Sequence, residues 1–433
     1  MTQCPHAEAA GAVPLSGPRF QAEPAQLYRE LRRDHGPVAP IALPGDIPAW
    51  LVLGYRELHQ VTGDPALFTR DSQLWNQWDA IPDDWPLMPM ISRTQPSVLY
   101  TVGERHSRRS AVICEALEAT NPFELRKSTE EFADELIDAF CPAGSADLIA
   151  EYAMLLPVRV LAKLYGFSDD KGPALVTAMN DMINGGPTAL AGQRHIATSV
   201  YALLAERRAE PGDDVASRML ANTAGFTDED VARDLMVMMA AGHQPTADWI
   251  GNSLRLMLTD DRFAASLSGG RHSVGEAMNE VLWEDTPTQN IAGRWAARDT
   301  HLGGRHIKAG DLIVLSLAGA NADPQVRTDG STLTGGNNAF FSFGHGDHRC
   351  PFPAQETAEV IARTAIEVIL DRLPDVDLAV PAEQLTRRPS PWLRGLTDLP
   401  VSFTPTVSRG GVSSARTGAA TSGTAPRGVA ETP

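Results

Sequence analysis

The sequence predicts a mainly α-helical protein with a small β region, and three patterns support this prediction. Amphipathic helical periodicity runs through residues 123–140, 149–165 and 198–208. A longer helix is predicted from a Thr227 cap to about Leu258, because acidic residues fill its first turn and its middle is apolar on nearly all sides. Between residues 38 and 61 apolar side chains alternate instead, which indicates a β-hairpin of a small sheet.

The bulk properties indicate a globular protein without nucleic-acid or membrane partners. The chain has 433 residues and a formal charge of −17. This charge disfavours binding to nucleic acid and to anionic membrane surfaces. The four cysteines lack the spacing of a disulfide framework, and no basic segment followed by an apolar run opens the chain. We therefore expect a soluble, cytoplasmic protein.

The composition of the two ends predicts that a single domain lies between two flexible segments. Residues 1–19 are small and punctuated by Gly and Pro, so we expect them to be flexible. Residues 24–34 predict a short helix, and the Trp-rich segment 71–100 predicts a loop held by its aromatic side chains. Residues 404–433 are rich in Gly, Ser, Ala, Thr and Pro and predict a disordered tail. The domain then covers residues 20–403.

One loop near the C-terminal end concentrates the chemistry. It runs from Phe340 to Cys350 with the sequence Phe-Phe-Ser-Phe-Gly-His-Gly-Asp-His-Arg-Cys. Two glycines two positions apart predict a sharp turn that lets a large flat group come close. Residues 354–370 predict a helix, so Cys350 lies near a helix N-terminus, where the dipole favours the thiolate. By residue type alone, a lone cysteine is more often a small buried hydrophobe than a ligand, and zinc is disfavoured because no neighbouring Cys or His completes four ligands.

This loop resembles the haem-binding loop of the cytochrome P450 family. The matching pattern is Phe343-Gly-x-Gly-x-His348-x-Cys350, and the resemblance extends over residues 20–403, closest to the soluble bacterial members. It implies the P450 fold, a helix-rich domain around haem with a small β-sheet region. It also implies haem b held by the Cys350 thiolate as the iron ligand. In the family, the segment that matches 71–100 covers the substrate pocket.

Three distant segments match the family residues that bind the haem propionates. His106 matches a histidine in that role, but the arginine expected four residues later is Ser110 here. The resemblance leaves Arg109 or Arg108 as substitutes from a neighbouring turn. Because two buried carboxylates require charged donors, we expect all these residues to converge. The remaining matches are Arg294 and His348.

The long helix departs from the family where oxygen binds. Ala241 and Gly242 match the residues that leave room there, but Gln244 and Pro245 replace an acid and a threonine. Because proline lacks an N–H and crowds the carbonyl of Ala241, we expect a kink and a freed acceptor. Gln244 and Thr246 are then the candidates for the catalytic handling of protons, through bound water.

A second departure concerns the family motif Glu-x-x-Arg, which reads Glu280-Val-Leu-Trp283 here. A buried carboxylate without a cation is costly by several kcal/mol. Glu280 must therefore find another donor, be solvated, or accept the indole N–H of Trp283.

A third departure follows the cysteine, where the chain reads Pro351-Phe352-Pro353. Backbone N–H groups at these positions stabilise the thiolate in the family, and proline has none. With fewer hydrogen bonds the sulfur keeps more electron density, so we expect an unusually negative reduction potential.

The resemblance implies a haem-thiolate oxidoreductase of the monooxygenase type. It would oxidise a small apolar substrate with dioxygen and with electrons from a ferredoxin-type donor. Arg105 and Arg108 lie where donors dock in the family, and a basic patch on an acidic protein steers an acidic partner. The three departures also leave open a haem-binding sensor or partner protein, and a peroxide-driven enzyme with little monooxygenase activity.

Overall fold

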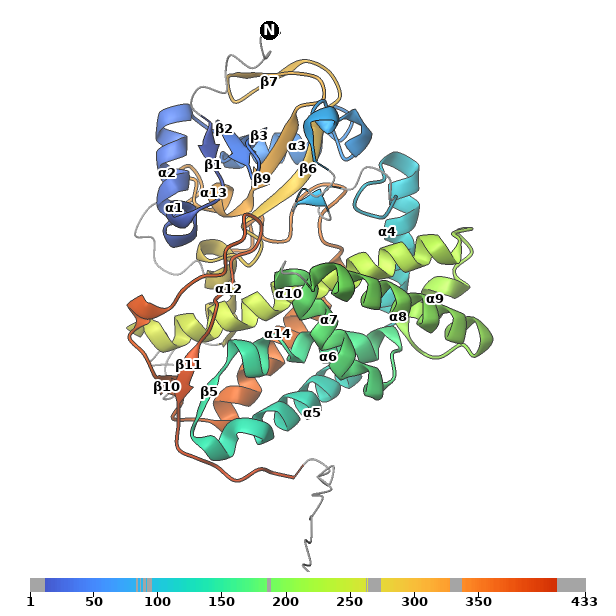
Figure 1. Cartoon of the computed structure of the whole chain (residues 1–433), viewed down its shortest axis with the longest axis vertical. Coiled ribbons are helices and arrows are strands. Elements are labelled where there is room, and N and C mark those ends of the chain that lie inside the picture. The colour runs from blue at the N-terminus through green and yellow to red at the C-terminus, as the bar shows by residue number, and fades with distance from the viewer. Residues whose placement is uncertain are drawn as a thin grey trace, which may run out of the picture.

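The structure, a computed structural model, describes residues 12–82, 85, 87–88, 91, 96–184, 188–261, 263, 274–327 and 337–410. A β-rich part lies at the top of Figure 1 and a larger helical part lies below it. The described helices are α1 (Pro18–Ala22), α2 (Pro24–His35), α3 (Tyr55–Gly63), α4 (Gly103–Glu118), α5 (Pro122–Phe140), α6 (Leu156–Tyr165), α7 (Gly172–Asn184), α8 (Ala189–Ala209), α9 (Val215–Ala221), α10 (Asp228–Thr259), α12 (Val274–Glu284), α13 (Leu317–Asn321) and α14 (Phe352–Arg372). The mainly helical fold class is thereby confirmed.

The β-rich part is built around a mixed sheet with the order β1-β2-β3-β9-β6-β4 in the described chain. The predicted hairpin is confirmed as β2 and β3, which pair antiparallel from Val38 with Val52 to Leu43 with Ile47. Two smaller sheets have the orders β10-β11-β5 and β7-β8. The strands are β1 (Val13–Pro14), β2 (Val38–Leu43), β3 (Ile47–Val52), β4 (Phe68–Thr69), β5 (Ser145–Asp147), β6 (Asn290–Ala296), β7 (Thr300–Leu302), β8 (Arg305–Ile307), β9 (Leu312–Ser316), β10 (Asp377–Leu378) and β11 (Pro400–Ser402).

One strand pairing matters for the site described below. Strand β4 pairs antiparallel with β6, with Thr69 opposite Trp295. In an antiparallel pair the residue after Thr69 lies beside the residue before Trp295. This register brings Arg70 next to Arg294, although more than half of the chain separates them in sequence.

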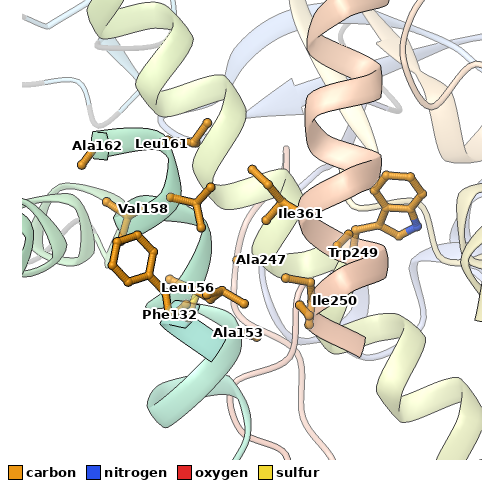
Figure 2. Close-up of a cluster of buried hydrophobic side chains, with 14 of the residues drawn as sticks. Phe132, Ala153, Leu156, Val158, Leu161, Ala162, Ala247, Trp249, Ile250 and Ile361 are labelled. Atoms are coloured by element: carbon orange, nitrogen blue, oxygen red, sulfur yellow. The ribbon is translucent and has the colours of Figure 1, made fainter. Parts of the chain in front are cut away.

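Helix α10 crosses the helical part and forms its centre (Figure 1). The predicted start is confirmed, because Thr227 and Asp230 form a reciprocal capping box in which the Thr227 Oγ1 accepts the Asp230 N–H at 3.2 Å. The helix is continuous through Pro245. Figure 2 shows the apolar contact of its middle with neighbouring helices, formed among others by Leu161, Ala247 and Ile361. This packing holds α10 against α6 and α14.

The predicted helix over residues 149–165 is divided in two. A π-helical turn covers Ile149–Ala153, and α6 starts at Leu156 with Pro157 in its first turn. The proline fits there because the first N–H groups of a helix have no intrahelical acceptor. The turn leaves Met154 at the junction, where its carbonyl faces α10.

The described ends differ in part from the predicted flexible segments. Strand β1 pairs with β2, and Leu15 is fully buried, so ordered structure begins before residue 20. Beyond residue 403, the Thr406 N–H donates to the Cys141 carbonyl, and the Arg409 N–H donates to Asp138. Residues 1–11 and 411–433, where flexibility was also predicted, lie outside the described residues.

Candidate active site

The cysteine loop is shaped by close contacts that only glycine permits. The Cys350 N–H donates to the Phe343 carbonyl at 2.8 Å, which closes the loop. Gly344 and Gly346 both have φ of 73°. A Cβ on Gly346 would collide with the Thr62 carbonyl of α3, so this glycine lets the loop lie against α3. The loop ends where α14 begins, and the Gln355 side chain donates to the Cys350 carbonyl at 2.6 Å.

The thiol of Cys350 has a raised pKa of about 12, because it is buried and lies near Cys114. The expected stabilisation of the thiolate by the dipole of α14 is outweighed by this burial. The first N–H groups of α14 are also depleted, since Pro351 is its N-cap and Pro353 lies in its first turn. The raised pKa favours the thiol in the protein alone, and coordination of a metal cation would deprotonate it.

Two histidines from distant segments stack beside the loop. The rings of His106, on α4, and His348, in the loop, lie 3.8 Å apart between centroids. His106 contacts the carbonyls of Val98 and Asp347 at 2.9 and 3.0 Å. His348 Nε2 lies 3.0 Å from the Thr101 carbonyl, and its Nδ1 lies 3.3 Å from an Arg294 nitrogen. Burial and the nearby arginines lower the pKa of His348 to about 2, so its ring is neutral.

Two buried arginines complete this group. Arg70 and Arg294 are 6% and 3% exposed, and neither forms an ion pair with a carboxylate of the described residues. Burial, followed by Arg70, lowers the pKa of Arg294 to about 9. Burial likewise lowers the pKa of Arg70, whose guanidinium donates to the Ala292 carbonyl at 3.0 Å. Asp347 is the carboxylate that acts on Arg294, but it forms no ion pair with it, so this group of two buried cations fits a ligand that carries carboxylates.

The sequence did not single out Arg70. Arg70 lies near Arg294 because β4 pairs with β6, and no local sequence pattern predicts this pairing. A long-range strand pairing depends on the packing of the whole sheet, and the residues of a two-residue strand carry little periodicity.

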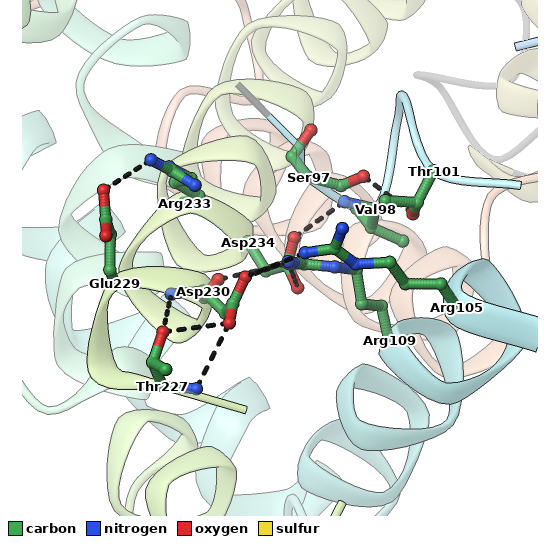
Figure 3. A network of polar contacts seen from close by, with 10 residues as sticks. All are labelled: Ser97, Val98, Thr101, Arg105, Arg109, Thr227, Glu229, Asp230, Arg233 and Asp234. Atoms are coloured by element: carbon green, nitrogen blue, oxygen red, sulfur yellow. Dashed lines mark hydrogen bonds and ion pairs between the residues drawn. The ribbon is translucent and has the colours of Figure 1, made fainter. Parts of the chain in front are cut away.

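Arg109 is directed elsewhere. Figure 3 shows its guanidinium between Asp230 and Asp234 of α10, with Arg105 beside Asp230. The Arg109 to Asp234 distance is 2.6 Å, and the other oxygen of Asp234 accepts the Val98 N–H at 2.7 Å. Arg109 thus links α4, α10 and residues 97–101. We name residues 97–101 the strap, because their carbonyls contact His106 and His348.

The residues of α10 that were singled out lie on different faces of the helix. Ala241 is exposed and Pro245, one turn later, is half-buried. Gly242 instead lies against α6, where a Cβ would approach the Leu161 side chain to 3.1 Å. Gln244 and Thr246 are 2% and 3% exposed, and the Gln244 amide donates to Asp248 at 3.0 Å. The structure therefore places Gln244, but not Gly242, next to a buried acid.

The loop and α10 meet through aromatic side chains. The ring of Phe343 packs edge-on against Trp249 of α10, with centroids 5.8 Å apart. The Trp249 indole donates to the Met278 carbonyl of α12 at 3.0 Å. The position of Phe343, and with it the start of the loop, is thereby fixed to two helices.

Two further properties of the described residues bear on the site. No group of three or more His, Cys, Asp and Glu side chains among them is arranged to hold a metal ion. None of the described helices combines the length and the apolar character needed to cross a lipid bilayer.

Comparisons with known proteins agree on one family. No family model matches the chain. A vitamin D(3) 25-hydroxylase from Pseudonocardia autotrophica is 29% identical over 396 residues, which cover 89% of this chain and 95% of the relative. Cytochrome P450 monooxygenase PikC from Streptomyces venezuelae is 28% identical over 400 residues, 89% of this chain and 92% of the relative. Among solved structures, testosterone-bound CYP154C4 from a Streptomyces species superposes with a TM-score of 0.82 at 26% identity, covering 90% and 98% of the two chains.

The fold, the cysteine loop and the buried cations define a haem-thiolate protein, with haem b as the cofactor and a cysteine thiolate as its iron ligand. Over nearly nine-tenths of its length the chain is similar to bacterial cytochrome P450s, and these relatives support the function of a haem-thiolate monooxygenase.

Proposed function

We propose that Cys350 ligates the haem iron and that His106, Arg70, Arg294 and His348 bind the two propionates. The proposal is supported by the pair of buried guanidiniums, neither of which forms an ion pair with a carboxylate of the described residues. Ala241, Gly242 and Phe343 are proposed to border the same group. Arg109 contributes through the strap, because it holds Asp234, which accepts the Val98 N–H.

When bound, the haem supplies the site for activating dioxygen. The protein then has to keep bulk water out and deliver protons to the face of the haem where dioxygen would bind, which we call the oxygen side. We propose that Gln244 and Thr246 take part in that delivery, since both are buried on α10 within one turn of Pro245. The amide cannot ionise, so it orients water or a neighbouring acid rather than acting as the proton source.

The electron donor is proposed to be an acidic ferredoxin-type protein. Arg105 and Arg108 of α4 and Arg349 of the loop are exposed, and Arg349 directly precedes the cysteine. On a chain with a formal charge of −17, such a local basic surface attracts an acidic partner and orients it. Encounter rates should then fall as ionic strength rises. A donor of this class implies a cytoplasmic location.

The substrate is proposed to be a small apolar molecule. A relative at 29% identity is named vitamin D(3) 25-hydroxylase, and a solved structure at 26% identity holds testosterone. Both compounds are therefore suitable first probes.

A peroxide-driven reaction is the second candidate, because Pro245 replaces the family threonine and removes its hydroxyl from the oxygen side. The test compares a substrate panel with a ferredoxin system and with hydrogen peroxide. Oxygenated product only with the electron donor supports the monooxygenase, and product only with peroxide supports the second candidate. No product with either, from protein whose reduced, carbon monoxide-treated spectrum shows thiolate ligation, points to a haem-binding sensor or partner protein instead.

A further inference from the structure

A buried acid lies one turn beyond Gln244 on the same helix. Asp248 is 4% exposed, and its Oδ1 accepts the Gln244 side-chain N–H at 3.0 Å. The same oxygen forms an ion pair with Arg388, which comes from the chain segment near the C-terminal end of the domain. Gly395 of that segment lies against this pair so closely that a Cβ would collide with both side chains. The acid and the amide are thus held by contacts from two elements.

Three polar atoms around this pair have no partner among the described residues. They belong to adjacent buried side chains of α10: Asp248 Oδ2, Gln244 Oε1 and His243 Nδ1. Leaving a buried polar atom unpaired costs the free energy of its lost hydration, so a cluster of three is unusual in a well-packed helix. A carboxylate oxygen and an amide oxygen that both lack a donor are suited to share a proton or a protonated water.

The helix places this pair on the same face as Ala241, which matches the family residue beside the oxygen site. Residues three, four and seven apart lie on one face of an α-helix, which relates Asp248 to Gln244, Pro245 and Ala241. Ala241 is the exposed residue of that face, and its carbonyl loses its intrahelical donor because Pro245 has no N–H. Acceptor groups therefore continue from Asp248 through Gln244 towards Ala241.

We propose that Asp248 is a positioning and proton-holding residue for the oxygen side, acting through Gln244. The family keeps an acid at the position of Gln244, and this chain carries its acid one turn later. The inference rests on the proposed role of Gln244. A proton held on Oδ2 of Asp248 passes to water bound beside the Gln244 amide, and the carboxylate left behind remains paired with Arg388.

The electrostatic surroundings suit this role. Burial raises the pKa of Asp248 to about 6, against the opposing effects of Arg388 and the Gln244 hydrogen bond. The acid thus holds its proton close to neutral pH, where a proton donor is most useful. The charged and titratable groups that face it are His243 on its own helix, Asp285 after α12, and Arg387 and Arg388 from the C-terminal segment.

The test uses the haem-loaded protein with a ferredoxin system and a substrate that it oxidises. Asp248→Asn should lower the product formed per electron consumed by roughly tenfold and increase the solvent isotope effect. In the wild type this ratio should fall as pH rises from 6 to 8, because Asp248 loses its proton, and in the variant the ratio should no longer depend on pH. Asp248→Glu should restore most of the loss. The control is Asp134→Asn on α5, which removes an ion-pair partner of Arg372 on α14. This variant should change neither the product ratio, nor its pH dependence, nor the isotope effect.

A second measurement does not depend on turnover. The infrared band of a protonated carboxyl group should titrate with a midpoint near pH 6 in the wild type and be absent from Asp248→Asn. Should that variant fold poorly, Arg388→Gln keeps the acid and removes its cation, which should shift both the infrared midpoint and the pH profile upward. An infrared titration near pH 6 combined with an unchanged product ratio in Asp248→Asn would overturn the proposal. If Gln244→Ala leaves turnover unchanged while Asp248→Asn lowers it, Asp248 still holds the proton, but the proposed route through Gln244 is overturned.

Discussion

The guanidinium of Arg327, in the segment between α12 and the cysteine loop, lies 2.7 Å from the carboxylate of Glu280 on α12. Glu280 is 2% exposed, and the same arginine reaches Glu284 at 3.0 Å. The last residue of the altered motif, Trp283, donates its indole N–H to the Asn337 carbonyl at 3.0 Å. The arginine that the motif lacks at position 283 is therefore supplied from another segment, and the indole ties α12 to the residues leading into the loop.

We expect Arg327→Ala to lower the free energy of unfolding by about 3 kcal/mol, because it leaves Glu280 buried without its cation. Urea unfolding measures this loss, and bound haem per chain measures the effect on the loop. Arg327→Lys should lose less stability than Arg327→Ala, since it keeps a cation within reach of Glu280. If Arg327→Ala is as stable as the wild type, the ion pair between Arg327 and Glu280 does not contribute to the stability of the fold.

The two buried arginines, Arg70 and Arg294, lead to a prediction about how tightly haem is retained. Arg70→Gln and Arg294→Gln should each speed the loss of haem to an acceptor globin by roughly tenfold, because each removes a charge-assisted hydrogen bond worth about 1.5 kcal/mol or more. Arg109→Gln should instead lower the stability of the fold, since its partners are Asp230 and Asp234. Equal haem loss in all three variants would contradict this division of roles.

The prolines beside the cysteine predict an electrochemical shift. Replacing Pro351 and Pro353 together by alanine returns two backbone N–H groups near the sulfur. One added hydrogen bond to the thiolate, worth about 1.5 kcal/mol, should raise the one-electron reduction potential by roughly 60 mV. Spectroelectrochemical titration of both proteins checks this, and Phe352→Ala serves as the control because position 352 has an N–H in either case. A potential that does not rise would show that these N–H groups do not reach the sulfur.

The environment of Asp285 predicts that the free energy of unfolding depends on pH in the acidic range. Burial alone would raise its pKa, but Arg387, Arg394 and Arg255 outweigh burial and hold the pKa far below the ordinary value. A carboxyl whose folded pKa is lowered stabilises the protein above its unfolded pKa of about 3.9, and this contribution is lost as pH falls through the folded value.

Asp285→Asn should therefore reduce the free energy of unfolding at pH 7 and flatten its decline below about pH 4. Chemical unfolding at a series of pH values measures both effects. The remote Asp134→Asn should keep the steep decline, and the same slope in the two variants would refute the assignment.

Much of the fold was readable from the residues themselves. The capping box at Thr227, the alternation of residues 38–52 and the glycine spacing before Cys350 are local patterns, and their physical causes act over a few residues. The family resemblance rested on the same local motif. It led to the haem-thiolate assignment that the relatives and the fold support.

The partners of the charged residues were decided by tertiary structure. The sequence placed Arg109 among the haem donors, whereas the fold pairs it with Asp234 and brings Arg70 beside Arg294. It also showed that Glu280 needs a cation without revealing that Arg327 supplies it. A long side chain adopts the partner that packing and strand register bring within reach, and both depend on contacts between distant segments. Local sequence therefore determined the elements and the choice of Cys350 as the proposed iron ligand, and only the folded chain determined which charges meet.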